Sequence, residues 1–200
     1  MFNVKTMFAR TLLALTLASG AGMALAAPTT YHVNVDTSAF SGNGYLDLNF
    51  GALGNAEQAN AFISNFTGSF GAGSLLVGEA AGSIASGVTL GNAEGFNDFA
   101  QLIALGGMFG FDVSFETAAT GAGSLFAVAL LNSSFDGYLG FEEAIGTISV
   151  FPGAATVFSG ANQFATITLV DPSAVPEPGQ WLLMATGLLL LGAMARRRNM

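Results

Sequence analysis

Residue types that could do chemistry are few in this chain of 200 residues. It contains no cysteine and a single histidine, His32. The absence of cysteine excludes a disulfide framework, a thiol nucleophile and cysteine-ligated metal centres. A Ser-His-Asp relay would need His32 as its base, but this histidine falls in a run that alternates like a β-strand, and no nucleophile-elbow motif occurs. We therefore expect His32 to be a surface residue of a strand.

Paired carboxylates are the remaining route to catalysis, because a glycosidase needs only two of them. Glu142 and Glu143 are adjacent, so they would face opposite ways on a strand or be solvated in a turn. Glu94 and Asp98 have helical spacing and could share a face. Nothing distinguishes either pair from ordinary acidic residues. We predict that the chain is not an enzyme and has no catalytic and no cofactor-binding residues.

Calcium is the best-motivated ligand, because acidic extracellular β-proteins can bind it through carboxylates and carbonyl oxygens. Two groups of residues could supply the oxygens: Asp136 with Glu142 and Glu143, and Asp36 with Asn43 and Asp47. The D-x-[DN]-x-[DN]-G loop of an EF-hand does not occur. We therefore predict no resident metal or cofactor and keep calcium as an alternative.

The charges of the chain are sorted by position. All five basic residues lie near the two ends, and no Lys or Arg occurs between Pro28 and Val175. Twelve of the 13 acidic residues lie in that same segment, which gives it a formal charge of −12. Nucleic-acid binding needs cationic groups to displace counterions from phosphates, so we exclude nucleic acid as a partner. Phosphate-bearing ligands lose their usual Arg or Lys clamp for the same reason.

The segment between the two ends alternates between apolar and polar residues with a period of two. The alternating runs cover residues 31–36, 46–50, 111–116, 147–150 and 166–169, and residues 125–131 are apolar on both faces. Many of the chain's 27 glycines fall between these runs, where turns need them. This pattern predicts an all-β ectodomain over residues 27–174, built as a β-sandwich or a jelly roll.

One stretch departs from the period of two. Phe96, Phe99, Leu102 and Ile103 recur at helical spacing, and Gly106-Gly107 ends the run. The spacing predicts one short helical segment packed over an end of the sandwich.

The N-terminal segment has the three parts of a secretory signal peptide. It begins with a basic region, continues with an apolar run over residues 12–17 and ends in the small-x-small sequence Ala24-Leu25-Ala26. We predict that residues 1–26 are a signal peptide, that signal peptidase removes it, and that Ala24 and Ala26 determine the cleavage site.

The C-terminal segment has three parts in a fixed order. Pro176-Glu177-Pro178 comes first, residues 181–195 carry no charge, and Arg196-Arg197-Arg198 follow. At about 1.5 Å per residue, an uncharged helix over 181–195 would cover roughly 23 Å of a hydrocarbon core of about 30 Å. Trp181 suits the outer interface, and the arginines mark the cytoplasmic side. We predict a transmembrane helix over 181–195 that anchors the ectodomain in the membrane.

Residues 175–200 resemble the PEP-CTERM sorting signal of Gram-negative bacteria. The resemblance implies that a membrane-embedded exosortase recognises this tail, with Pro176, Glu177 and Pro178 as the motif and the arginines as the membrane stop. It also implies cleavage at or near the motif and transfer to the cell surface, where exopolysaccharide is made. Looser strand patterns over residues 31–37, 44–47, 96–99 and 111–115 resemble a group of uncharacterised PEP-CTERM proteins, and this second resemblance brings no activity.

Together these patterns predict an exported, non-enzymatic protein. Its ectodomain would stand in the periplasm on the inner membrane and then reach the cell surface or the extracellular matrix, with a structural or interaction role in exopolysaccharide and biofilm. The alternative is a glycan-binding module that uses exposed aromatic residues such as Tyr45 or Tyr138 on a face of the sandwich. A carbohydrate-active enzyme is the third hypothesis.

Overall fold

The computed structural model describes residues 29–93, 95–118, 120–152 and 157–170, together with Gly187. The predicted signal peptide with Ala24 and Ala26, the motif Pro176-Glu177-Pro178 and the stop Arg196-Arg197-Arg198 lie outside the described residues. The predicted membrane helix over 181–195 lies outside them too, apart from Gly187. Within the described part of the chain, no helix has the length and hydropathy needed to span a membrane.

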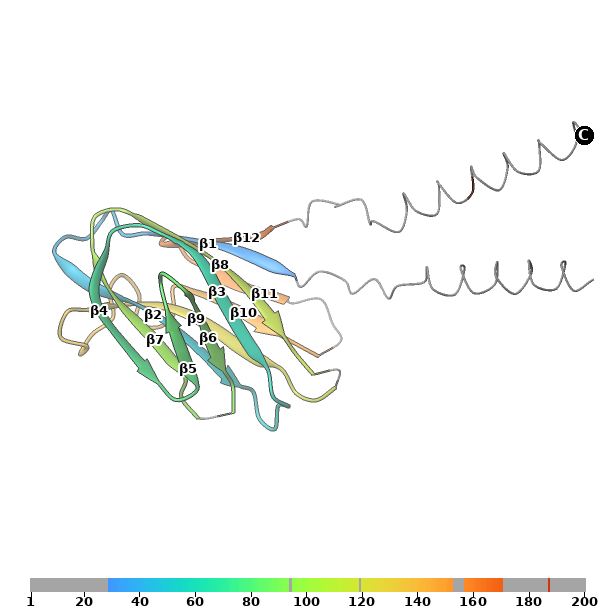
Figure 1. The fold of residues 1–200 in the computed structure, drawn as a ribbon. Coiled ribbons are helices and arrows are strands. Elements are labelled where there is room, and N and C mark those ends of the chain that lie inside the picture. Colours follow the sequence, from blue (N-terminus) through green and yellow to red (C-terminus); the bar gives the residue numbers. More distant parts are fainter. Residues whose placement is uncertain (1–28, 94, 119, 153–156, 171–186, 188–200) are drawn as a thin grey trace, which may run out of the picture. The chain divides into compact units, whose positions relative to one another are not determined.

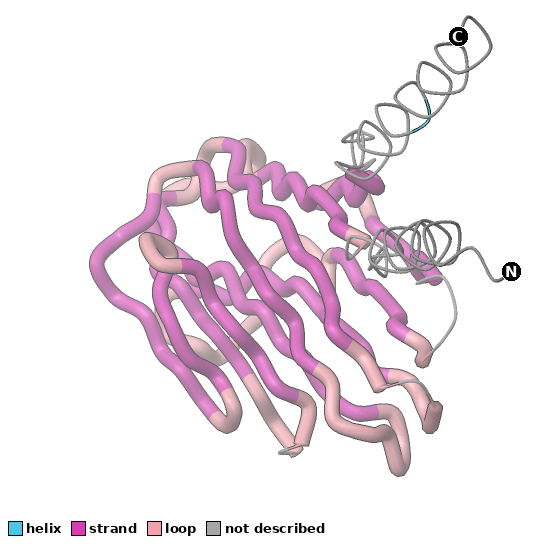
Figure 2. Tube along the Cα trace, turned by 45° about the vertical axis from the view of Figure 1, so that its right-hand side comes forward, coloured by secondary structure: helices cyan, strands magenta, loops and turns pink. Residues whose placement is uncertain are grey.

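The described part of the chain forms two six-stranded sheets whose neighbouring strands are all antiparallel (Figures 1 and 2). The first sheet contains, in spatial order, β12 (Ala165–Val170), β1 (Thr30–Asp36), β8 (Met108–Glu116), β3 (Asn60–Thr67), β6 (Gly87–Gly91) and β5 (Ala80–Ser83). The second sheet contains β11 (Val157–Ala161), β10 (Gly146–Val150), β9 (Ser124–Asn132), β2 (Asn43–Ala52), β7 (Asp98–Ala104) and β4 (Phe70–Val77). All twelve described elements are strands, which confirms the all-β prediction.

Strand pairing within the two sheets is nested. β1 pairs with β8 and β3 with β6 in the first sheet, while β2 pairs with β7 in the second. These three nested pairs are those of a jelly roll, in which a long antiparallel hairpin folds over on itself. The order departs from it at β5, which pairs with β6 in the first sheet and not with β4. The four later strands extend the two sheets, because β9, β10 and β11 continue the second sheet and β12 continues the first.

The core lies between the two sheets and is built by the alternation seen in the sequence. Inward-facing residues of both sheets are buried: Val33 and Val35 of β1, Leu46, Leu48 and Phe50 of β2, Phe111 and Val113 of β8, and Phe126, Val128 and Leu130 of β9. Phenylalanine rings join the layers, since Phe126 of the second sheet meets Phe111 and Phe115 of the first at centroid distances of 6.4 and 5.8 Å. The alternate residues of each strand consequently point to the outer faces, where solvent and ligands can reach them.

The prediction of a helix beginning near Phe96 is wrong. Residues 98–104 form β7, which is hydrogen-bonded between β2 and β4. Its first four residues are all buried, so the side chains on both faces of this part of the strand are covered. Phe99 and Ile103 are four residues apart, and this spacing places two side chains on one face of a helix and equally on one face of a strand. Gly106, with a φ of +100°, belongs to the tight connection from β7 to β8 rather than to a helix end.

Candidate binding pocket

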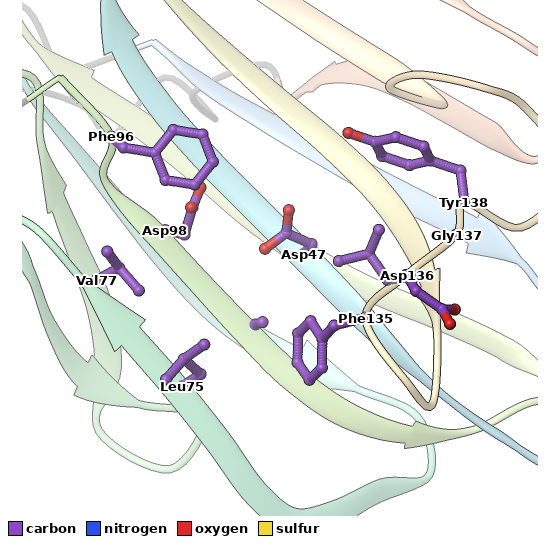
Figure 3. A pocket seen from close by; sticks show the side chains of 11 residues that line it. Asp47, Leu75, Val77, Phe96, Asp98, Phe135, Asp136, Gly137 and Tyr138 are labelled. Atoms are coloured by element: carbon purple, nitrogen blue, oxygen red, sulfur yellow. The ribbon is translucent and has the colours of Figure 1, made fainter.

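An open pocket of about 340 Å³ lies on the outer face of the second sheet (Figure 3). Strands β2, β4, β7 and β9 supply one part of its lining, and the segments flanking β7 and following β9 supply the rest. We call it the outer pocket, and it is lined by Asp47, Leu75, Val77, Phe96, Asp98, Ala100, Leu131, Phe135, Asp136, Gly137 and Tyr138. The lining combines aromatic rings with carboxylates, and a pocket of this size suits a small ligand or a few units of a chain.

Two aspartates on neighbouring strands form the floor of the outer pocket. Because Leu46 and Leu48 face the core, Asp47 between them must face outward. Asp47 lies opposite Ala100 of β7, and Asp98 lies opposite Asn49 of β2, so the two carboxylates are diagonal neighbours on one face. Figure 3 shows Asp47 near the centre, with Phe96 and Asp98 to the left, Tyr138 to the upper right and Phe135 below.

Asp47 has small apolar residues beside it on both neighbouring strands. Its cross-strand partners on both sides are alanines, Ala100 on β7 and Ala129 on β9. No described residue donates a hydrogen bond that lowers its pKa, and burial together with the negative charge of Asp98 raises the pKa of Asp47 to about 7. The small alanine side chains also leave open the space above Asp47 that forms the pocket.

As a residue, Asp98 is less exposed than Asp47, and among the described residues its carboxylate has a hydrogen-bond donor that Asp47 lacks. Only 6% of the residue is exposed, and burial raises its pKa. The side chain of Asn49 opposes this effect by donating a hydrogen bond of 2.6 Å from Nδ2 to Oδ1 of Asp98. The pocket floor therefore holds two carboxylates that are both deprived of water and are in electrostatic contact.

One wall of the outer pocket is the loop that follows β9. Asn132 organises this loop, because its Nδ2 donates to Oδ1 of Asp136 at 2.6 Å and its Oδ1 accepts from the backbone N–H of Ser134 at 3.1 Å. The ring of Phe135 stacks on Tyr45 of β2 with a centroid distance of 4.0 Å. Tyr138 remains 53% exposed at the pocket edge. The loop thus presents two aromatic rings above the carboxylates.

The opposite wall is the segment that enters β7. Asn97 is fully buried and fixes this segment, since its Nδ2 donates to the carbonyl of Phe50 at 3.0 Å and its Oδ1 accepts from the N–H of Glu79 at 2.8 Å. Its neighbour Phe96 is 65% exposed and lines the pocket. A rigid buried amide therefore holds an exposed aromatic ring beside Asp98.

The sequence predicts that Tyr45 or Tyr138 is an exposed aromatic residue on a sandwich face, and the structure gives a different result for each of them. Tyr138 lines the outer pocket and is exposed. Tyr45 lies on the same face but is partly buried under Phe135, so it supports the loop.

His32 lies on the outer face of the first sheet, opposite Thr168 of β12. Its Nδ1 contacts Oδ1 of Asp112 at 2.5 Å, and its Nε2 lies 3.3 Å from Oδ1 of Asn34. Burial raises the pKa of Asp112, but hydrogen bonds from Asn65 and His32 outweigh it and leave the pKa below its ordinary value. Within the described residues no hydroxyl contacts Nε2 of His32, so this His-Asp pair lacks the third member of a relay.

The other candidate carboxylates are not brought together. Glu142 and Glu143 are exposed in the segment between β9 and β10, and Glu94 lies outside the described residues. Asp36 belongs to the first sheet and accepts a hydrogen bond from the N–H of Ser38 at 2.9 Å, whereas Asp47 belongs to the second. Among the residues that the structure describes, no three His, Asp or Glu residues form a group that could hold a metal ion.

The pairing of Asp47 with Asp98 was not predicted from the sequence. The sequence spacing groups each residue with other partners, Asp98 with Glu94 on a helix and Asp47 with Asp36 and Asn43. The available clue was that both aspartates occupy outward positions beside buried apolar residues. Only the register of β2 against β7 shows that these positions are neighbours.

The fold and the outer pocket define a class: an all-β protein of two antiparallel sheets with an aromatic and acidic pocket on one outer face. Residues 174–198 match the family model of the PEP-CTERM protein-sorting motif. The chain is thus a protein with a PEP-CTERM sorting domain, as the motif Pro176-Glu177-Pro178 predicted. This motif supports an exported protein that is membrane-anchored until an exosortase processes it. No curated protein and no solved structure matches the chain.

Proposed function

We propose that the exported domain binds polysaccharide in the extracellular matrix of a Gram-negative bacterium, without cleaving it, and that the outer pocket is the binding site. Signal peptidase would release the domain into the periplasm on its C-terminal anchor, and exosortase would then deliver it to the cell surface. There it would have an interaction role in exopolysaccharide and biofilm. The outer pocket is the observation that carries this proposal.

Sugar binding fits the chemistry of the outer pocket. The faces of pyranose rings carry C–H groups that pack on aromatic rings, and Phe96, Phe135 and Tyr138 offer such rings. Sugar hydroxyls are donors, and the carboxylates of Asp47 and Asp98 are acceptors. The pocket is open, which lets a long chain cross it and leave on either side.

Glycoside cleavage is the second candidate function, and the Asp47–Asp98 pair favours it. A glycosidase needs one carboxylic acid that stays protonated near neutral pH and a second carboxylate beside it. Burial, together with the negative charge of Asp98, raises the pKa of Asp47 to about 7, so Asp47 could serve as the acid and Asp98 as the second carboxylate. We rank this function second because the rest of the pocket lining is mostly apolar, with Asp136, whose Oδ1 is bound to Asn132, and the hydroxyl of Tyr138 as its other polar side chains.

Retention on the producer's own exopolysaccharide tests the proposal. The protein purified from the producing cells should be retained on a column of that polysaccharide, and Tyr138→Ala should reduce retention by about 10-fold or more because a stacking ring is lost. Phe141→Ala is the matched control, since Phe141 is equally exposed in the same segment but does not line the pocket. No retention of the unaltered protein would overturn binding, and release of new reducing ends that stops in Asp47→Asn would favour cleavage instead.

A further inference from the structure

The outer pocket concentrates negative charge in a domain that has no Lys or Arg to balance it. Residues 28–175 contain neither residue type, and twelve acidic residues lie among them. Within the pocket, Asp47 receives no compensating hydrogen bond from the described residues, and burial raises its pKa. A ligand that brings a positive charge would relieve this unfavourable electrostatic state, whereas a polyanionic sugar chain would worsen it.

The aromatic lining is an independent observation that points to the same kind of ligand. Phe96, Tyr138 and Phe135 lie around Asp47 on three different sides (Figure 3). The faces of aromatic rings attract cations, and rings combined with carboxylates are a recurrent way to recognise ammonium groups. The same rings stack on sugar faces, so one pocket can recognise both parts of an amino sugar.

A metal ion fits the pocket less well than an ammonium group. Calcium takes about six to eight oxygen ligands, but the described residues contain no group of three or more His, Asp or Glu that could hold a metal. Asp136 also lines the pocket, yet its Oδ1 is bound to Asn132 at 2.6 Å. An ammonium group needs only a few acceptors, and Asp47 and Asp98 supply them.

We propose that the outer pocket selects polysaccharides whose sugars carry free amino groups, with one ammonium group held between Asp47 and Asp98. This inference rests on the proposed function and narrows it to one substrate class. Neutral sugars would leave the two carboxylates without a counter-charge. Uronic-acid polymers would meet repulsion from the whole domain, because its formal charge is −12.

The first test compares the producer's polysaccharide before and after chemical N-acetylation, which converts amines into neutral amides. Retention of the purified protein should fall at least about 10-fold after N-acetylation, because a charge-assisted hydrogen bond is lost. Equal retention on both columns would overturn the amino-sugar inference and leave the proposed function standing. Absence of retention on the untreated polysaccharide would overturn the proposed function itself.

The second test measures affinity for defined probes by calorimetry, at a pH at which amines are protonated. A glucosamine hexamer should bind about 10- to 100-fold more tightly than an N-acetylglucosamine hexamer of the same linkage, and a galacturonic acid hexamer should not bind. Equal affinity for the two amino-sugar hexamers, no binding of the glucosamine hexamer, or binding of the acidic hexamer would each contradict the inference.

Two variants test whether the carboxylates of the pocket floor cause the preference for the glucosamine hexamer. Asp47→Asn and Asp98→Asn should each bring the affinities for the two hexamers close together. Glu116→Gln changes the net charge by the same amount at an exposed position of the first sheet, so it should keep the preference. Loss of the preference in Glu116→Gln as well would show that overall charge is responsible, and would overturn the assignment to Asp47 and Asp98.

Discussion

Asn49 of β2 donates a hydrogen bond of 2.6 Å from its Nδ2 atom to Oδ1 of Asp98, which lies directly opposite on β7. Asp47, two residues earlier on the same face of β2, lies opposite alanines on both sides. One strand therefore supplies a hydrogen-bond donor to one carboxylate of the outer pocket and leaves the other without a donor. Burial raises the pKa of both carboxylates, and among the described residues only Asp98 has a hydrogen-bond donor that opposes the rise.

Replacing Asn49 should make Asp98 harder to ionise. Burial already raises the pKa of Asp98, and the Asn49 side chain is the group that lowers it. Asn49→Ala removes this donor, so the carboxyl resonance of Asp98 in an NMR titration should move to higher pH. Asn43→Ala, at the exposed start of β2, is the control and should leave the titration unchanged. An unaltered Asp98 titration in Asn49→Ala would contradict the role given to this hydrogen bond.

Asp47 should make the protein less stable as the pH rises from about 4 to about 7. Its pKa is raised from 3.8 to about 7 in the folded protein, so in this window the unfolded chain has lost the proton and the folded protein still holds it. The folded state binds more protons, and the free energy of unfolding therefore falls with rising pH, by about 2–4 kcal/mol over the window for this group.

Asp47→Asn isolates this contribution. The free energy of unfolding of each protein is measured by denaturant titration across the window. The value for the variant minus the value for the unaltered protein should increase as the pH rises. Asn43→Ala, at the exposed start of β2, changes no titratable group, so its difference from the unaltered protein should stay constant with pH. A constant difference for Asp47→Asn would show that Asp47 ionises at its ordinary pH.

Gln101 should stabilise the irregular edge of the second sheet. The pairing of β4 with β7 shifts register between Phe70 and Ser74, and the Nε2 atom of Gln101 donates to the carbonyls of Gly71 and Gly73 at 2.7 and 3.0 Å. Gln101→Leu leaves these acceptors without their donor and should lower the free energy of unfolding by about 1–3 kcal/mol. Gln58→Leu, at an exposed position outside the strands, should change it by less than about 0.5 kcal/mol. Equal stabilities of the two variants would contradict this role.

Much of the sheet structure could be predicted because one face of each strand is buried. The runs over 31–36, 46–50, 111–116, 125–131, 147–150 and 166–169 correspond to β1, β2, β8, β9, β10 and β12. In β1, Tyr31, Val33 and Val35 are buried and the residues between them are partly exposed, as the alternation predicts. Burial of a single face is what makes a period of two visible.

Strands β3, β4 and β7 are not predicted from the sequence because their residues do not alternate clearly between apolar and polar. In β4, Leu75, Leu76 and Val77 are all exposed at the sheet edge, so their run does not alternate. In β3, Phe62 points outward and is 40% exposed, which obscures the inward positions of Ala61 and Ile63. In β7, burial on both faces removed the alternation and left a spacing that also fits a helix. The outer pocket depends on β4 and β7, and for this reason the sequence did not reveal it.

The sorting motif should determine both the length and the location of the mature protein. Proline has no backbone N–H donor and disfavours a helical conformation at the residue before it, and both properties suit a recognition motif of a protease. Intact mass and N-terminal sequencing of protein from cells and medium should show a chain that starts at Ala27 or Pro28 and ends near Val175. Replacing the three motif residues by alanine should leave the C-terminal segment attached and the protein in the membrane fraction. Pro172→Ala, just outside the matched residues 174–198, is the control and should be processed normally. An intact C-terminus in the unaltered protein would contradict exosortase cleavage and leave a permanently anchored protein.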